Sequence, residues 1–236
     1  MNFFRFLFPP KCVICKKAVQ EYNTICSGCY KKVKKIQKPF CNKCSDLMDF
    51  KISDDDICLK CAKEQPLYIK ARSAFVYNNF ISKLIMRFKF YDETYLKTFM
   101  AKNMLDASID IIDKIDILIP VPLHKSRLRQ RKYNQSLLLC KEIAGMSGKV
   151  IIGDFLLKTK QTTAQAELKQ NARKENLKNN FMVNEKYLME EYKNKTFAIV
   201  DDVMTTGTTI NECIKVLNKK GIKNVYAMTF AKTKFK

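Results

Sequence analysis

Four Cys-x-x-Cys pairs within the first 61 residues constrain the fold of this chain more than any other feature. They are Cys12/Cys15, Cys26/Cys29, Cys41/Cys44 and Cys58/Cys61. Such a knuckle turns tightly enough to place two thiolates on one metal ion, and two knuckles complete a tetrahedral zinc site. We therefore predict two four-cysteine Zn²⁺ sites. Sequential pairing of the knuckles is the default, and pairing of the first with the third and the second with the fourth is the alternative.

The N-terminus favours zinc over disulfide bonds. Its apolar stretch is broken by Arg5, no small-residue cleavage site follows, and no apolar run reaches the roughly 18 residues of a membrane span. We expect a cytoplasmic protein without a transmembrane segment, with peripheral contact at the inner face of the cytoplasmic membrane as a further option. Thiols stay reduced in the cytosol. We predict a zinc-ribbon domain over residues 1–65 and a second domain over residues 66–236.

Lysine and arginine exceed aspartate and glutamate by 21, whereas the 47% of hydrophobic residues is typical of a globular chain. The excess charge has two explanations, a lysine-rich solvated surface or an anionic partner such as nucleic acid, polyphosphate or an acidic membrane. Charge alone does not separate them.

The pattern after residue 70 alternates between strands and helices. We predict strands over 71–77, 114–119, 150–157, 196–200 and 224–230, and helices over 80–90, 95–112, 134–144 and 208–220. This alternation indicates an α/β fold with a largely parallel sheet flanked by helices.

The segment from Val200 to Thr209 carries the strongest chemical signal. A buried strand delivers Asp201 and Asp202 to the edge of the sheet where α/β folds bind ligands. Gly207 allows close backbone approach, and the following helix N-terminus and threonine hydroxyls favour an anion. No Walker-type loop occurs in the chain. The segment therefore predicts a sugar-phosphate site, in which the carboxylates suit ribose hydroxyls or the metal of a pyrophosphate.

Two basic segments accompany this loop. Five cations follow the strand that ends near Pro120, and they suit either a pyrophosphate, a nucleic-acid backbone or a solvated face: Lys125, Arg127, Arg129, Arg131 and Lys132. His124 is either a general base or a turn residue. Residues 158–180 are either a flap that closes over the site or a basic loop.

The segment 200–209 resembles the loop of type I phosphoribosyltransferases that binds 5-phosphoribosyl 1-pyrophosphate (PRPP). Nearly the whole chain resembles the ComF family of ComFC-type competence proteins. The resemblance is carried by the four knuckles, by Ile119-Pro-Val-Pro-Leu-His124 and by Arg131-Lys-Tyr-Asn-Gln135. It implies a double zinc ribbon followed by a type I phosphoribosyltransferase fold. The family usually has Arg-Gly-Phe-Asn-Gln at 131–135, so the backbone shape of this turn stays open.

The resemblance also implies roles for individual residues. Asp201 and Asp202 would be the catalytic pair that faces the ribose. The rest of the PRPP site would be Val203, Met204, Thr205, Thr206, Gly207, Thr208 and Thr209. The pyrophosphate side would be Val121, Pro122, Leu123, His124, Lys125, Arg127 and Arg131. The flap would contribute Lys158, Lys160, Gln165 and Arg173.

The function implied is a competence protein that binds PRPP with Mg²⁺ and assists uptake or handling of single-stranded DNA, together with other components of the uptake machinery at the inner membrane. One alternative is an active phosphoribosyltransferase acting on a base or amine, and turnover stays open. A third is a zinc protein that binds nucleic acid and uses the phosphoribosyl site for regulation. Tyr30, Phe40, Phe50 and Tyr68 are candidates for base stacking, with core packing as the alternative.

Overall fold

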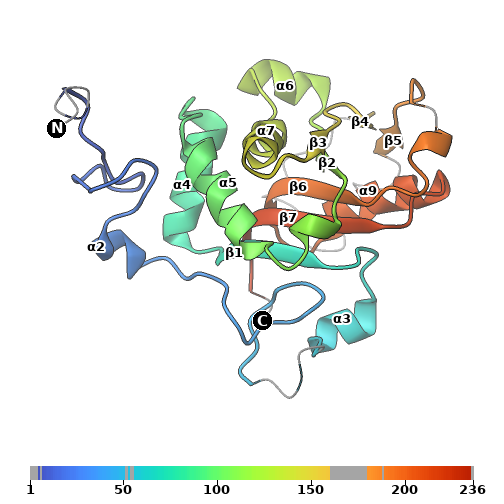
Figure 1. Ribbon diagram of the computed structural model, residues 1–236, viewed down its shortest axis with the longest axis horizontal. Helices are drawn as coiled ribbons and strands as arrows, with labels where there is room; N and C mark the ends of the chain where they lie inside the picture. The colour runs from blue at the N-terminus through green and yellow to red at the C-terminus, as the bar shows by residue number, and fades with distance from the viewer. Residues whose placement is uncertain are drawn as a thin grey trace.

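The computed structural model describes residues 5, 7–50, 53, 56–159, 180–187 and 189–234. Its centre is a five-stranded parallel sheet in the order β1-β7-β6-β2-β3 (Figure 1). The strands are β1 (Ala71–Val76), β2 (Ile117–Pro120), β3 (Val150–Ile151), β6 (Phe197–Met204) and β7 (Val225–Lys232). The predicted α/β class is therefore confirmed, although β6 continues four residues beyond the predicted end at Val200.

Helices cover both faces of this sheet. On one face lie α4 (Asn79–Phe90), α5 (Leu96–Ala107) and α7 (Gln135–Ser147), whose buried side chains pack around Phe75 and Phe230. On the other lie α9 (Thr208–Lys219) and an antiparallel hairpin of β4 (Leu156–Lys158) and β5 (Phe181–Val183). The lone cysteines Cys140 and Cys213 are fully buried in these two cores, as their apolar helical spacing predicts.

Side-chain caps explain where the helices begin. Asn134 accepts hydrogen bonds from the amides of Ser136 and Leu137, and Asn78 caps α4 in the same way. Four of the five cations after β2 lie in the short helix α6 (Lys125–Arg131), and the fifth, Lys132, is its C-cap. The predicted helix over 95–112 ends at Ala107, and the 3₁₀ turn η1 (Ile112–Lys114) follows it. A second 3₁₀ turn, η3 (Met189–Glu191), precedes β6.

The cysteine-rich segment follows the β1 edge of the sheet. It contains α2 (Ser27–Tyr30) and α3 (Leu59–Glu64), which lie at opposite ends of the segment (Figure 1). Between them the Ile36 amide donates to the Ala74 carbonyl at 2.9 Å, and the Val76 amide donates to the Lys34 carbonyl at 2.8 Å. The connection thus extends the sheet by one short antiparallel pairing. The domain division at residue 65 stays a prediction.

Among the residues that the structure describes, no helix has the length and apolar character needed to cross a membrane.

Candidate functional site

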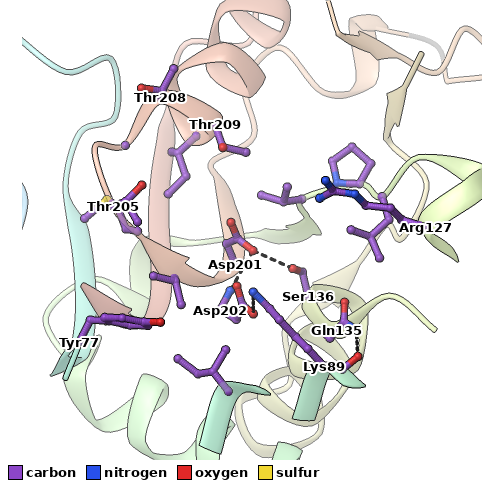
Figure 2. A pocket seen from close by; sticks show the side chains of 18 of the residues that line it. Tyr77, Lys89, Arg127, Gln135, Ser136, Asp201, Asp202, Thr205, Thr208 and Thr209 are labelled. Atoms are coloured by element: carbon purple, nitrogen blue, oxygen red, sulfur yellow. Dashed lines mark hydrogen bonds and ion pairs between the residues drawn. The ribbon is translucent and has the colours of Figure 1, made fainter. Parts of the chain in front are cut away.

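A cavity of about 490 Å³ lies at the carboxyl edge of the parallel sheet (Figure 2). The carboxyl ends of parallel strands meet at one edge, so segments distant in the sequence line a common cleft there. Its walls come from the end of β6 and the following loop, from the residues after β2, and from the ends of α4, α6 and α7.

Asp201 and Asp202 lie at the centre of this cavity (Figure 2). Asp201 Oδ1 accepts hydrogen bonds from Ser136 Oγ at 3.1 Å and from the Asp202 amide at 2.9 Å. Asp202 Oδ2 pairs with Lys89 Nζ at 2.5 Å. Burial and the adjacent Asp202 carboxylate raise the pKa of Asp201 to about 7, against the opposing effect of Lys89. The surroundings of Asp201 therefore disfavour its charged form.

The loop before α9 forms one end of the cavity, with Thr205, Gly207, Thr208 and Thr209 among its lining residues. Gly207 is the N-cap of this 12-residue helix and has φ of 79°, a left-handed conformation that favours glycine. The amides of the first helical turn lack intrahelical partners, and the helix dipole places positive potential there. Together with the hydroxyls, this end of the cavity suits a phosphate. Thr206 is turned aside, its hydroxyl bonded to that of Thr208 at 2.7 Å.

The opposite end contains the predicted pyrophosphate side. Val121, Pro122, Leu123, Arg127 and Arg131 line the cavity, and so does Lys158 of the predicted flap. The pKa of Lys158 is lowered by burial and by the nearby Arg127. The remaining flap candidates Lys160, Gln165 and Arg173 lie outside the described residues.

His124 and Lys125 do not belong to the lining of this cavity. His124 is the N-cap of α6, where its Nδ1 accepts from the Ser126 amide at 3.3 Å. The structure thus places this residue at the turn, the alternative that the sequence left open beside a general base.

The turn at 131–135 keeps a glycine-type backbone although a lysine occupies the glycine position. Lys132 has φ of 65°, and its ammonium pairs with Asp92 at 3.1 Å. Arg131 stacks over the Phe90 ring, 4.6 Å from its centroid, and donates to Gln135 at 3.2 Å. Lys132 therefore adopts the left-handed conformation that a glycine takes easily, although it is a lysine.

Several lining residues escaped the sequence analysis. They come from the ends of β1 and β7, from α4 and from the start of α7: Tyr77, Met86, Lys89, Ser136 and Thr233. Their positions show no local motif, because the sheet topology alone brings these ends together. Figure 2 shows Tyr77 and Arg127 on opposite sides of the Asp pair.

The eight cysteines form two clusters in sequential pairing. Cys12, Cys15, Cys26 and Cys29 form the first, Cys41, Cys44, Cys58 and Cys61 form the second, and within each the sulfur atoms lie within 4.8 Å of one another. The Cys15–Cys26 and Cys44–Cys58 sulfurs are 3.6 and 3.8 Å apart. A Zn–S bond of about 2.3 Å in a tetrahedron requires about 3.8 Å between sulfurs. The clusters therefore fit two four-cysteine zinc sites.

The two zinc modules attach to the sheet differently. The second is built into the core, with Cys41, Cys44 and Cys61 at most 6% exposed. Arg72 of β1, 2% exposed, donates to the Asn42 carbonyl at 2.9 Å and to Asp110 at 2.6 Å. In the first module Cys15 is exposed. There Arg87 of α4 donates to the Val13 and Ile14 carbonyls at 2.8 and 3.1 Å.

The aromatic candidates divide between surface and core. Tyr30 and Phe50 are 53% and 68% exposed, whereas Tyr68 is 4% exposed. Phe40 packs under the Arg72 guanidinium, 5.3 Å from the ring centroid. Tyr22, which the sequence analysis did not single out, is 42% exposed on the first module.

Comparison with known proteins matches both halves of the chain. A double zinc ribbon domain matches residues 3–62, and a phosphoribosyl transferase domain matches residues 139–234. The chain is 30% identical to "Competence protein F" of Haemophilus influenzae, over 98% of this chain and 99% of the relative. It is 25% identical to "DNA utilization protein YhgH" of Salmonella typhimurium, over 94% and 90%. It is 27% identical to "Competence protein ComFC" of Bacillus subtilis, over 84% and 79%. The chain therefore belongs to the ComF family, whose members join a double zinc ribbon to a phosphoribosyltransferase domain.

Proposed function

We propose that this protein is a competence protein that binds PRPP in the cavity at the sheet edge and assists the handling of single-stranded DNA in the cytoplasm. The observation that carries the proposal is the gathering of three kinds of group in one cavity. These are the Asp201–Asp202 pair, the phosphate-type loop before α9, and the cations Arg127 and Arg131. The names of relatives in competence and DNA utilization support the same role.

The geometry suggests how PRPP would lie. Its 5′-phosphate would face the amides and hydroxyls of residues 205–209, and its ribose hydroxyls would face Asp201 and Asp202. The pyrophosphate would then point toward Arg127, Arg131 and Lys158. Mg²⁺ prefers oxygen ligands, and the Asp201 carboxylate fits it together with the pyrophosphate oxygens. When bound, the ion would neutralise the charge of the pyrophosphate.

One observation favours a transferase as the second candidate function. The cavity continues past the Asp pair to Tyr77, Met86 and Thr233, where the side chains leave a partly apolar end. An acceptor base or amine would find room there, on the far side of the ribose from the pyrophosphate. In that reaction the acceptor nitrogen bonds to the anomeric carbon while the bond to the pyrophosphate oxygen breaks. Release of pyrophosphate with a given acceptor identifies it, and PRPP binding without release favours the first candidate.

The first zinc module offers the surface that suits DNA. Residues 11–40 contain eight lysines and one acidic residue, Glu21, whereas residues 41–64 contain four lysines and six acidic residues. Exposed Tyr22 and Tyr30 lie among the lysines of the first module. Lysines that track a backbone and aromatic rings that stack on bases are the two components of single-strand binding. On this proposal the protein works beside the uptake machinery at the inner face of the cytoplasmic membrane.

Calorimetric titration of PRPP with Mg²⁺ into the zinc-loaded protein tests the ligand. We expect saturable binding by the wild type and a loss of at least 100-fold in Asp201→Ala/Asp202→Ala, because the variant loses both acceptors for the ribose. Metal analysis should still find two zinc ions per chain. Undiminished binding by the variant would contradict the proposed site, and loss of zinc would contradict the separate roles of the two halves.

Fluorescence anisotropy with a labelled oligothymidine tests the DNA surface. We expect Lys31→Glu/Lys32→Glu/Lys34→Glu to weaken binding and to reduce the slope of log K against log salt by about 2, at about 0.7 per phosphate contact. The matched control replaces three exposed lysines at and after the end of α9 with glutamate: Lys219, Lys220 and Lys223. An equal loss in the control would mean that net charge rather than the first module binds the DNA.

A further inference from the structure

Lys89 is a cation of the cavity that belongs to no sequence motif. It lies in the last turn of α4, and its Nζ is 2.5 Å from Asp202 Oδ2, with 22% and 6% of the two side chains exposed. Figure 2 shows its chain reaching from α4 to the Asp pair. The contact joins segments that are more than 100 residues apart in the sequence, so only the fold creates it.

The end of α4 is held in place from the neighbouring loop. Tyr133 Oη donates to the Phe88 carbonyl at 2.7 Å, and Gln135 Nε2 donates to the Lys89 carbonyl at 3.5 Å. Tyr133 lies in the turn between α6 and α7, and Gln135 is the first residue of α7. The ammonium group is therefore delivered by an anchored backbone rather than by a free helix end.

The Asp pair needs such a cation. Two adjacent carboxylates at a buried strand end repel one another, and burial adds a further penalty for ionising both. The titratable and charged groups that surround the pair come from five elements: Lys89 of α4, Arg131 of α6, Cys140 of α7, Lys158 of β4 and Cys213 of α9. Burial raises the pKa of both thiols, so they stay neutral and the balance is set by the carboxylates and the cations.

We propose that Lys89 is a positioning residue that neutralises Asp202 from within the protein and so leaves Asp201 to face the sugar-phosphate ligand and its metal. The inference rests on the proposed function and assigns different roles to the two carboxylates. Asp202 keeps its charge and orientation through the ion pair. Asp201, hydrogen-bonded to Ser136, is the carboxylate that the ligand meets.

Removal of the ammonium has a defined consequence. Without it Asp202 loses the group that fixes its position, and the charge of the two adjacent carboxylates is no longer offset from α4. An anionic ligand would then meet a more negative site. A divalent cation near the pair would then replace part of the missing positive charge, so a Lys89 variant should depend more strongly on Mg²⁺ than the wild type does.

The experiment compares ribose 5-phosphate binding by zinc-loaded full-length wild type, Lys89→Met, Lys89→Arg and Lys83→Met. Lys83 is exposed on the same helix and serves as the matched control. At neutral pH without Mg²⁺ we expect Lys89→Met to bind at least tenfold more weakly than the wild type. The difference in affinity should narrow on addition of Mg²⁺, and Lys89→Arg should bind nearly as well as the wild type.

Three results would overturn the proposal: an unchanged affinity in Lys89→Met, a loss that is independent of Mg²⁺, or an equal loss in Lys83→Met. A second readout needs no ligand, namely the NMR chemical shifts of the Asp201 and Asp202 backbone amides. Lys89→Met, or Lys89→Gln if the first variant does not fold, should change both shifts, whereas Lys83→Met should not. If the wild type binds neither ribose 5-phosphate nor PRPP, the proposed function fails, and this comparison still decides the role of Lys89.

Discussion

Replacement of Cys61 by alanine removes one thiolate from the second zinc cluster, and the structure predicts a large loss of stability. A structural zinc site contributes roughly 10–16 kcal/mol to the folding of its own segment, more than a short cysteine-rich segment gains by packing. We therefore expect the segment around Cys41 and Cys44 to lose its native conformation in this variant. The sheet then loses whatever this segment contributed to it.

That contribution follows from the contacts between the second module and β1. The Ala71 amide donates to the Lys43 carbonyl at 2.8 Å, and Ser45 Oγ donates to the Ala71 carbonyl at 2.7 Å. Arg72 donates to the carbonyl and the side-chain oxygen of Asn42 at 2.9 and 3.2 Å. At about 1 kcal/mol for each net hydrogen bond, these four contribute about 4 kcal/mol. The Cys61→Ala free energy of unfolding should fall by about this amount.

Cys15→Ala in the first module is the matched control. That module is held to the two ends of α4 by two hydrogen bonds from Arg87 and one from Asn78 Nδ2 to the Lys32 carbonyl at 3.0 Å. The Lys16–Glu93 ion pair is half exposed on the lysine side and adds little. Loss of the module should therefore lower the free energy of unfolding by about 3 kcal/mol. Urea unfolding at neutral pH in zinc-containing buffer measures both. With a slope of about 3 kcal/mol per molar urea, the midpoints should fall by about 1.3 M for Cys61→Ala and by about 1.0 M for Cys15→Ala. Metal analysis should find one zinc ion per chain in each variant.

Equal midpoints for the two variants would refute the reasoning, because they would show that burial of the second cluster adds no stability to the sheet. A Cys61→Ala protein that retains both zinc ions would show that three thiolates suffice, and the comparison would then be repeated with Cys41→Ala/Cys61→Ala.

Three further predictions concern charge and backbone conformation. The Arg87 guanidinium lowers the pKa of Glu93 to about 2. The stability that this pair provides is therefore present above about pH 4.5 and is lost as the pH falls toward 2. Glu93→Gln should lower the free energy of urea unfolding by about 2 kcal/mol at pH 7, and the difference from the wild type should shrink at pH 3. Lys132→Gly should raise the free energy of unfolding by about 1 kcal/mol, because φ of 65° strains a lysine and not a glycine; a lower melting temperature would contradict this. Gly207→Ala has room for its methyl group, since the nearest atom is Met204 Sδ at 3.9 Å, but φ of 79° should still cost about 1 kcal/mol and weaken PRPP binding in calorimetry.

The zinc ribbon shows what cysteine spacing predicts about this fold and what it does not. Four knuckles predict two zinc sites, and this is what the clusters fit. The spacing left sequential and interleaved pairing open, and the structure shows sequential pairing. The first cluster has one exposed cysteine, Cys15, and the second has none. Spacing does not encode this difference, because it depends on β1 and Arg72 lying against the second module.

The basic segment after β2 shows a limit of pattern reading. Five cations in eight residues predict an anion site or a solvated face, and the pattern does not show that the chain forms α6 there with His124 as its cap. Only Arg127 and Arg131 of the five line the cavity. A helix directs side chains three to four residues apart to one face, so a run of like residues divides between the ligand side and solvent.

The sequence by itself determined the features that depend on short stretches of chain. The knuckles bind metal through residues three positions apart. The segment Asp201–Thr209 contains the two carboxylates, the glycine and the start of the next helix within ten residues. The tertiary structure alone decided which distant side chains complete the site. Lys89 reaches Asp202 because the end of α4 and the end of β6 meet at the same edge of the sheet, a contact that no local pattern carries.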